Sequence, residues 1–176
     1  MRVFNFSAGP AALPEPVVQR IREDLPSWQG SGMSVMEVSH RGAPFVEMAE
    51  RCEARLRSLL GVPDSYRVLF AHGGATSQFA GVPLNLATPE DRADYLVTGH
   101  WGTKAVEQGT NFLHVNVAAN TADSGFTRVP EPGDITLTGR AAYVHYTPNE
   151  TIGGVEYPYI PDSGDVPLVA DYSSSI

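Results

Sequence analysis

Residues 72–79, His-Gly-Gly-Ala-Thr-Ser-Gln-Phe, form a glycine-rich stretch around which the other predicted elements can be placed. The apolar run 66–71 before it predicts a buried strand, and residues 79–86 after it predict a helix in spite of one glycine and one proline. A turn between a strand and a helix leaves N–H groups of the first helical turn unpaired, at the positive end of the helix dipole. Thr76 and Ser77 add hydroxyl donors. The stretch therefore predicts an anion site, most naturally for a phosphate, although a small-residue turn that serves packing alone has the same appearance.

The composition is that of an ordinary globular chain. It has 176 residues, 42% of them hydrophobic, and a formal net charge of −8, which argues against nucleic acid as a partner but not against a small anion at a local site. No apolar stretch approaches the roughly 20 residues that cross a membrane, and no signal peptide is recognisable. The only cysteine, Cys52, excludes an intrachain disulfide and fits a reducing compartment. Its place on the apolar side of a helical pattern predicts a small core residue.

The first third of the chain predicts an arm, two helices and a loop. Residues 1–14 are irregular, while apolar residues at helical spacing predict helices over 15–25 and 44–60. In the long loop between these helices, His40 and Arg41 form a cationic pair beside a glycine. An arginine fork can clamp a planar carboxylate, but the pair could equally be a solvated surface feature.

The rest of the chain alternates short apolar runs with helical or polar segments. This alternation predicts an α/β fold built on a mainly parallel, doubly wound sheet. The segment 119–138 is polar, contains glycine and proline, and predicts a surface excursion. The further strands are expected at residues 94–99, 112–117, 141–146 and 166–171.

Several expected strands end in a turn with distinctive side chains. In parallel sheets, ligands bind beyond the carboxyl ends of the strands. The pair Ala75 and Thr76 offers a phosphate cradle, Trp101 a stacking aromatic, Thr151 a hydroxyl and Asp171 a carboxylate. Together they suit a phosphorylated aromatic cofactor such as pyridoxal phosphate, with the carboxylate paired to the pyridinium nitrogen. Trp101 could instead be a packing residue beneath a loop.

Five motifs resemble the N-terminal half of the phosphoserine aminotransferase family, whose members are class V, fold-type I pyridoxal-phosphate enzymes. The resemblance covers essentially the whole chain. It implies that residues 15–176 form the incomplete three-layer large domain of such an enzyme, with a mainly parallel sheet and an end before the small C-terminal domain. The motifs are FNFSAGP at residues 4–10, SVMEVSHRG at 34–42, HGGATSQF at 72–79, HYTPNETIGG at 145–154 and DYSS at 171–174.

The resemblance also implies roles for individual residues. Ala75 and Thr76 match the family's phosphate-binding pair, although some members have an arginine in place of Thr76. Trp101 matches the residue that stacks on the cofactor ring, Thr151 the contact to the ring oxygen, and Asp171 the partner of the pyridine nitrogen. The implied function is transamination between 3-phosphohydroxypyruvate plus glutamate and O-phosphoserine plus 2-oxoglutarate in a cytoplasmic homodimer. A phosphohydroxythreonine step of pyridoxine synthesis is implied for many bacterial members.

The remaining implied roles concern the substrate and the Schiff-base lysine. His40 and Arg41 match contacts to the substrate anion, offered to the neighbouring subunit. The family's Schiff-base lysine is expected beyond Ile176, and the only lysine of the chain, Lys104, does not match it. Without that amine we expect this polypeptide to be inactive alone. The alternatives are a non-catalytic fragment that binds the cofactor noncovalently, and a related class V desulfurase or transaminase, against which the His-Arg-Gly and Pro-Asn-Glu-Thr motifs argue.

Overall fold

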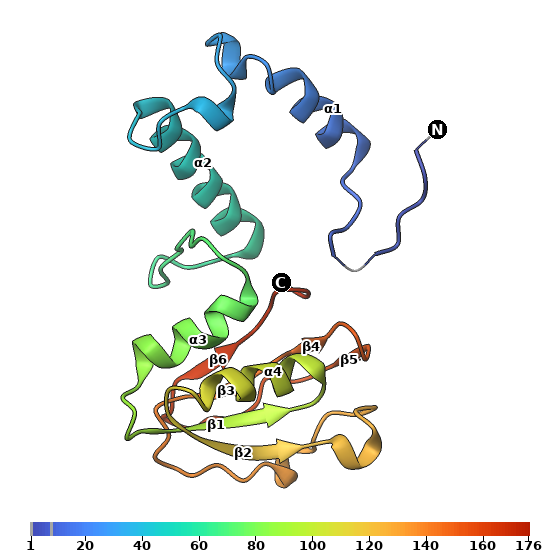
Figure 1. Ribbon diagram of the computed structural model, residues 1–176, viewed down its shortest axis with the longest axis vertical. Coiled ribbons are helices and arrows are strands. Elements are labelled where there is room, and N and C mark those ends of the chain that lie inside the picture. The colour runs from blue at the N-terminus through green and yellow to red at the C-terminus, as the bar shows by residue number, and fades with distance from the viewer. Residues whose placement is uncertain (1, 8) are drawn as a thin grey trace. The chain divides into compact units, whose positions relative to one another are not determined.

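The protein divides into two compact units, as seen in a computed structural model that describes residues 2–7 and 9–176 (Figure 1). The first unit ends at Ala71 and the second unit is His72–Ile176. Helices belong to both units, whereas all strands assigned in the described residues belong to the second. None of the helices in this described part is long and apolar enough to span a membrane.

The first unit contains the two helices that the apolar periodicity predicts. Helix α1 is Glu15–Asp24, with a proline in its first turn, and α2 is Ala43–Leu60. Gly61 ends α2 in the left-handed conformation, with φ of 64°, which glycine adopts at little cost. Two short 3₁₀ helices, η1 (Trp28–Gly30) and η2 (Val35–Glu37), occupy the loop between α1 and α2.

Two predictions for the first unit are wrong. Residues 66–71 form no strand, because their backbone pairs with none of the described strands and their side chains are largely exposed. Cys52 is exposed rather than part of a core. In both cases the sequence has the apolar pattern of a buried element, but burial also needs a neighbour that covers it, and none of the described residues of this unit does so.

The second unit is built on a four-stranded parallel sheet in the order β2-β1-β3-β6. The predicted mainly parallel α/β fold is thereby confirmed. A separate antiparallel hairpin, β4-β5, follows β3 in the chain. The bounds of the strands are β1 Arg92–Val97, β2 His114–Asn120, β3 Val144–Tyr146, β4 Asn149–Glu150, β5 Val155–Glu156 and β6 Leu168–Ala170.

The two faces of this sheet are covered differently. Helices α3 (Ala75–Leu86) and α4 (His100–Gly109) pack on one face, around the buried Tyr95 and Tyr143 (Figure 1). The other face, around Tyr146, is covered by irregular chain from residues 129–137 and 157–168.

The segment 119–138 is therefore not the surface excursion that its polarity predicts. Strand β2 continues to Asn120, and two 3₁₀ helices, η3 (Ala122–Ser124) and η4 (Pro132–Asp134), follow it. Apolar residues of the segment, Val129, Ile135 and Leu137 among them, pack against the sheet. These apolar residues are sparse and have no regular period, so the sequence does not predict that they anchor a layer over the sheet.

Gly109 is expected to be one of the positions in the second unit least tolerant of a larger side chain. A Cβ atom there would lie 2.5 Å from the hydroxyl oxygen of Tyr95, which is buried and 2.6 Å from the Tyr143 hydroxyl. We expect Gly109→Ala to lower the free energy of unfolding by about 1–3 kcal/mol, the usual cost of overpacking. Urea denaturation would measure it.

Gly81 provides the matched control for this substitution. It also lies inside a helix, but a Cβ atom there would meet first the flexible side chain of Gln78, at 3.4 Å from Oε1. Gly81→Ala should be neutral or stabilising because alanine has the higher helix propensity. Equal losses of stability in the two variants would contradict the steric explanation for Gly109.

Candidate functional site

The start of α3 presents unpaired backbone donors at the carboxyl end of the sheet. Gly73 takes a φ of 99° and Gly74 is the N-cap residue, which has no side-chain cap. Ser77 donates its N–H to the Gly74 carbonyl at 3.0 Å, whereas those of Ala75 and Thr76 have no acceptor among the described residues. This is the geometry of an anion site at a helix N-terminus.

The start of α4 places Trp101 at the same end of the sheet. Trp101 is half-buried and its ring lies edge-on to that of His100, with centroids 4.9 Å apart. Its backbone N–H donates to Oε2 of Glu150 at 2.8 Å, and the N–H of Gly102 donates to Oε1 at 2.7 Å. Glu150 is completely buried. A carboxylate from a distant strand thus caps this helix.

Thr151 contacts the segment that follows β6. The Thr151 hydroxyl donates to Oγ of Ser174 at 2.9 Å. Asp171 follows β6 directly, and its Oδ1 accepts hydrogen bonds from the N–H and the hydroxyl of Ser173. Its other carboxylate oxygen, Oδ2, has no hydrogen-bond donor among the described residues and remains available to a ligand.

A buried histidine lies beneath this edge. His145 in β3 is 3% exposed, stacks on Tyr95 with centroids 5.1 Å apart and meets the ring of Phe79 edge-on. Burial lowers the pKa of His145 to about 4, and the negative charge of Asp171 opposes this shift. Since Phe79 belongs to α3 and His145 pairs with Val169 of β6, the histidine lies between the helix that begins at Ala75 and the strand that precedes Asp171.

Several buried hydroxyls near the strand ends have no hydrogen-bond partner among the described residues. Thr98, Thr121 and Thr147 follow β1, β2 and β3 respectively, and each is at most 2% exposed. The Tyr157 hydroxyl is also unpartnered, and burial raises the pKa of Tyr157. Such groups are usually satisfied by ordered water.

The structure thus brings together five of the residues that the sequence singles out, at one edge of one unit: Ala75, Thr76, Trp101, Thr151 and Asp171. His40 and Arg41 belong to the first unit, where they are exposed in the turn before α2. Two further residues at this edge, Glu150 and His145, are not among the site residues that the sequence predicts. Both lie within the motif at residues 145–154, but their burial and their contacts are seen only in the folded chain.

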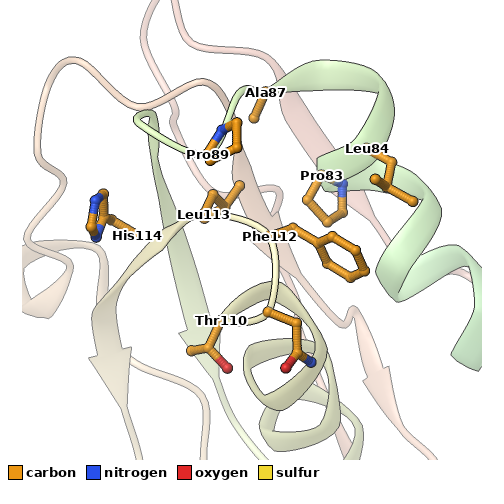
Figure 2. Close-up of a pocket in the computed structure, with 9 residues that line it drawn as sticks. Pro83, Leu84, Ala87, Pro89, Thr110, Phe112, Leu113 and His114 are labelled. Atoms are coloured by element: carbon orange, nitrogen blue, oxygen red, sulfur yellow. The ribbon is translucent and has the colours of Figure 1, made fainter.

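A hollow lies away from this edge of the sheet. Figure 2 shows Pro83, Leu84 and Phe112 around it, with Thr110 and His114 as its polar rim. Its volume is about 400 Å³. Because His114 begins β2 and Leu84 lies near the end of α3, the hollow is at the amino end of the strands, opposite the candidate site.

The fold and this site define a class of protein. Residues 3–174 match the family model described as aminotransferase class V. The chain belongs to that family, as the motifs predict.

The relatives specify the match further. The phosphoserine aminotransferases of Stenotrophomonas maltophilia strain K279a and Xylella fastidiosa strain 9a5c are 54% and 53% identical to the chain, over 99% and 100% of its length. Among solved structures, it resembles the phosphoserine aminotransferase of Bacillus circulans subsp. alkalophilus with a TM-score of 0.92 at 43% identity over 97% of the chain, and the pyridoxal-phosphate-bound enzyme of Trichomonas vaginalis with a TM-score of 0.91 at 39% over 99%. In each case the chain spans about half the length of the relative, 47–49%.

Proposed function

We propose that the second unit binds pyridoxal phosphate and that the chain belongs to a phosphoserine aminotransferase. The observation that carries the proposal is the pair of free N–H groups at Ala75 and Thr76 on the same sheet edge as the Asp171 carboxylate. An anion site at one point and an acid at another match the two ends of this cofactor, its phosphate and its ring nitrogen. The relatives' names and the pyridoxal-phosphate-bound neighbour support the same cofactor.

The residues at this edge would divide the binding between them. The N–H groups of Ala75 and Thr76 and the Thr76 hydroxyl bind the phosphate, with the helix dipole adding to the attraction. Trp101 stacks on the ring, and the Thr151 hydroxyl turns from Oγ of Ser174 to donate to the ring oxygen. Asp171 keeps a proton on the ring nitrogen, which it attracts through its free oxygen. When bound, the cofactor supplies an electron sink for the amino-acid chemistry.

The substrates and the setting belong to the same proposal. The substrates are 3-phosphohydroxypyruvate and glutamate, giving O-phosphoserine and 2-oxoglutarate, in a cytoplasmic homodimer of serine biosynthesis and, in some bacteria, of pyridoxine biosynthesis. His40 and Arg41 would bind the substrate's anionic groups in the neighbouring subunit's site. Their exposure and the planar guanidinium of Arg41 suit that task.

Lys104 is not a candidate for the amine that this chemistry requires. Its side chain is 45% exposed, and its Nζ lies 2.6 Å from Oε2 of Glu107 on the outer surface of α4. An exposed ammonium that is strongly hydrated and held in an ion pair on the surface of a helix is poorly placed to act as a nucleophile at the candidate site. We propose that a polypeptide of these 176 residues binds the cofactor noncovalently and is inactive alone, because the catalytic lysine is supplied by the part of the family that this chain does not match.

Titration with pyridoxal phosphate tests the proposal directly. Trp28→Phe leaves Trp101 as the only tryptophan, so quenching of its fluorescence reports binding at the site. We expect saturable binding of pyridoxal phosphate and at least tenfold weaker binding of pyridoxal, because pyridoxal lacks the phosphate that the α3 N-terminus holds. Borohydride treatment followed by mass spectrometry should leave Lys104 unlabelled, and Lys104→Arg should bind as the parent does. Equal affinity for the two compounds, or label on Lys104, would overturn the proposal.

A further inference from the structure

Glu150 is the most completely enclosed carboxylate near the candidate site. It is 0% exposed and accepts two hydrogen bonds, from the N–H groups of Trp101 at 2.8 Å and Gly102 at 2.7 Å. The two donors lie 49 and 48 positions away from it in sequence. Burying an ionised carboxylate is costly unless its oxygens are hydrogen-bonded, so this contact must be geometrically well defined wherever the fold forms.

Two glycines make room for this carboxylate. A Cβ atom at Gly99 would lie 2.6 Å from Cδ of Glu150, and one at Gly102 would lie 3.2 Å from Oε1. Gly99 has extended backbone, which any residue can adopt, so its small size matters here rather than its flexibility. The side chain of Glu150 therefore fills a notch that the absence of a side chain at Gly99 leaves open, with Gly102 in close contact.

Helix α4 depends on this contact for its first turn. Its N-cap residue is Gly99, which offers no side-chain cap. Glu150 performs that role from β4, and its negative charge faces the positive end of the helix dipole. The first turn of α4, which carries Trp101, is therefore capped by an acid on another element, while the Trp101 ring packs against the core of the sheet.

The neighbours of Glu150 connect this contact to the cofactor site. Thr151 follows it in the chain and is held by Ser174 through the hydroxyl contact at 2.9 Å. We infer that Glu150 is a positioning residue that fixes the ring of Trp101 relative to Thr151, so that Trp101 meets the face of a planar ligand and Thr151 meets the oxygen on its ring. The inference rests on the proposed function for the identity of that ligand, but the effect on Trp101 is a property of the chain itself.

The first readout needs no ligand. In the Trp28→Phe background, Glu150→Gln replaces one acceptor oxygen with an amide that cannot accept the second N–H. We expect iodide or acrylamide to quench Trp101 at least twofold more strongly in this variant and the near-UV circular dichroism of Trp101 to weaken. Glu156→Gln is the matched control, because Glu156 lies in the same hairpin, is exposed and pairs with Asn149 rather than with α4. It should behave as the parent does.

The second readout is the affinity for pyridoxal phosphate, measured where urea unfolding shows each variant to be fully folded. We expect at least fivefold weaker binding in Glu150→Gln and partial rescue in Glu150→Asp, which keeps the charge but is one methylene shorter. If Glu150→Gln does not fold, Glu150→Asp is compared with the parent by the same two readouts. A folded variant of Glu150 with unaltered quenching and affinity would overturn the inference. Failure of the parent to bind pyridoxal phosphate would instead overturn the proposed function, while the quenching comparison would still decide the role of Glu150.

Discussion

Acidification from pH 7 to pH 4 is expected to lower the free energy of unfolding by roughly 3 kcal/mol through His145 alone, since its pKa of about 4 in the folded protein lies below the ordinary value of 6.5. The cause is burial. The ring is 3% exposed, stacks on Tyr95 and touches Phe79. Its Nδ1 has no hydrogen-bond partner among the described residues, so the negative charge of Asp171 is what favours a proton on the ring, and it offsets only part of the cost of burial.

The direction of this effect follows from proton binding. Between pH 6.5 and pH 4 the unfolded chain protonates this imidazole while the folded chain does not, so the unfolded state binds more protons. The stability that the neutral ring contributes is complete above pH 6.5 and is lost as the pH falls toward 4. Carboxylates of the chain titrate in the same range, so the contribution of one residue must be isolated by substitution.

Urea denaturation at about pH 7 and about pH 4.5, on either side of most of this titration, measures the contribution. His145→Phe keeps an aromatic ring between Tyr95 and Phe79 but removes the titrating group, and its loss of stability on acidification should be clearly smaller than that of the parent. His114→Gln is the control, because His114 is exposed at the start of β2, and its acid dependence should match the parent's. An identical dependence on pH in His145→Phe and the parent would show that burial of this ring does not govern acid stability.

The sequence predicts some parts of the fold and not others. The sequence patterns placed α1 and α2 within one residue of their bounds and the start of α3 within four, because local periodicity and nearby glycine or proline residues decide where helices end. The same reasoning failed for residues 66–71 and Cys52, because an apolar pattern reports the capacity for burial and not the presence of a neighbour. The sequence predicts a mainly parallel sheet, but it does not predict that the strands lie in the order β2-β1-β3-β6.

The residues of the candidate site also differ in whether the sequence predicts them. Trp101, Thr151 and Asp171 could be found from the sequence because each follows a strand, and the carboxyl ends of parallel strands meet at one edge. Glu150 and His145 could not be found in this way. Their importance lies in complete or nearly complete burial and in contacts between segments far apart in the chain, both of which depend on how strands pair. Their roles toward a cofactor, like those of the predicted residues, stay predictions until binding is measured.

Asp171→Asn is expected to weaken the binding of pyridoxal phosphate by about 10- to 100-fold, corresponding to the roughly 1.5–3 kcal/mol of a hydrogen bond to a charged group. Oδ1 of Asp171 is already engaged by Ser173, so Oδ2 is the oxygen that can face a protonated ring nitrogen. An asparagine can keep the contact from the Ser173 N–H and the local turn. It cannot keep the negative charge that holds a proton on the ring.

The chain provides a matched control for this substitution. Asp162 forms the same local turn, with its Oδ1 accepting the N–H of Gly164 two residues on at 2.9 Å, but it is exposed. Asp162→Asn should leave the affinity unchanged.

Comparison of two ligands makes the prediction specific to the ring. Pyridoxal and pyridoxal phosphate share the ring nitrogen but not the phosphate. If Asp171 acts on that nitrogen, Asp171→Asn must weaken both ligands by the same factor, because the free energy lost belongs to a contact that both make. Inorganic phosphate, measured by its competition with pyridoxal phosphate, should then bind the variant and the parent equally, since the donors at Ala75 and Thr76 are untouched. A loss confined to pyridoxal phosphate would contradict a contact between Asp171 and the ring nitrogen, because pyridoxal carries the same nitrogen.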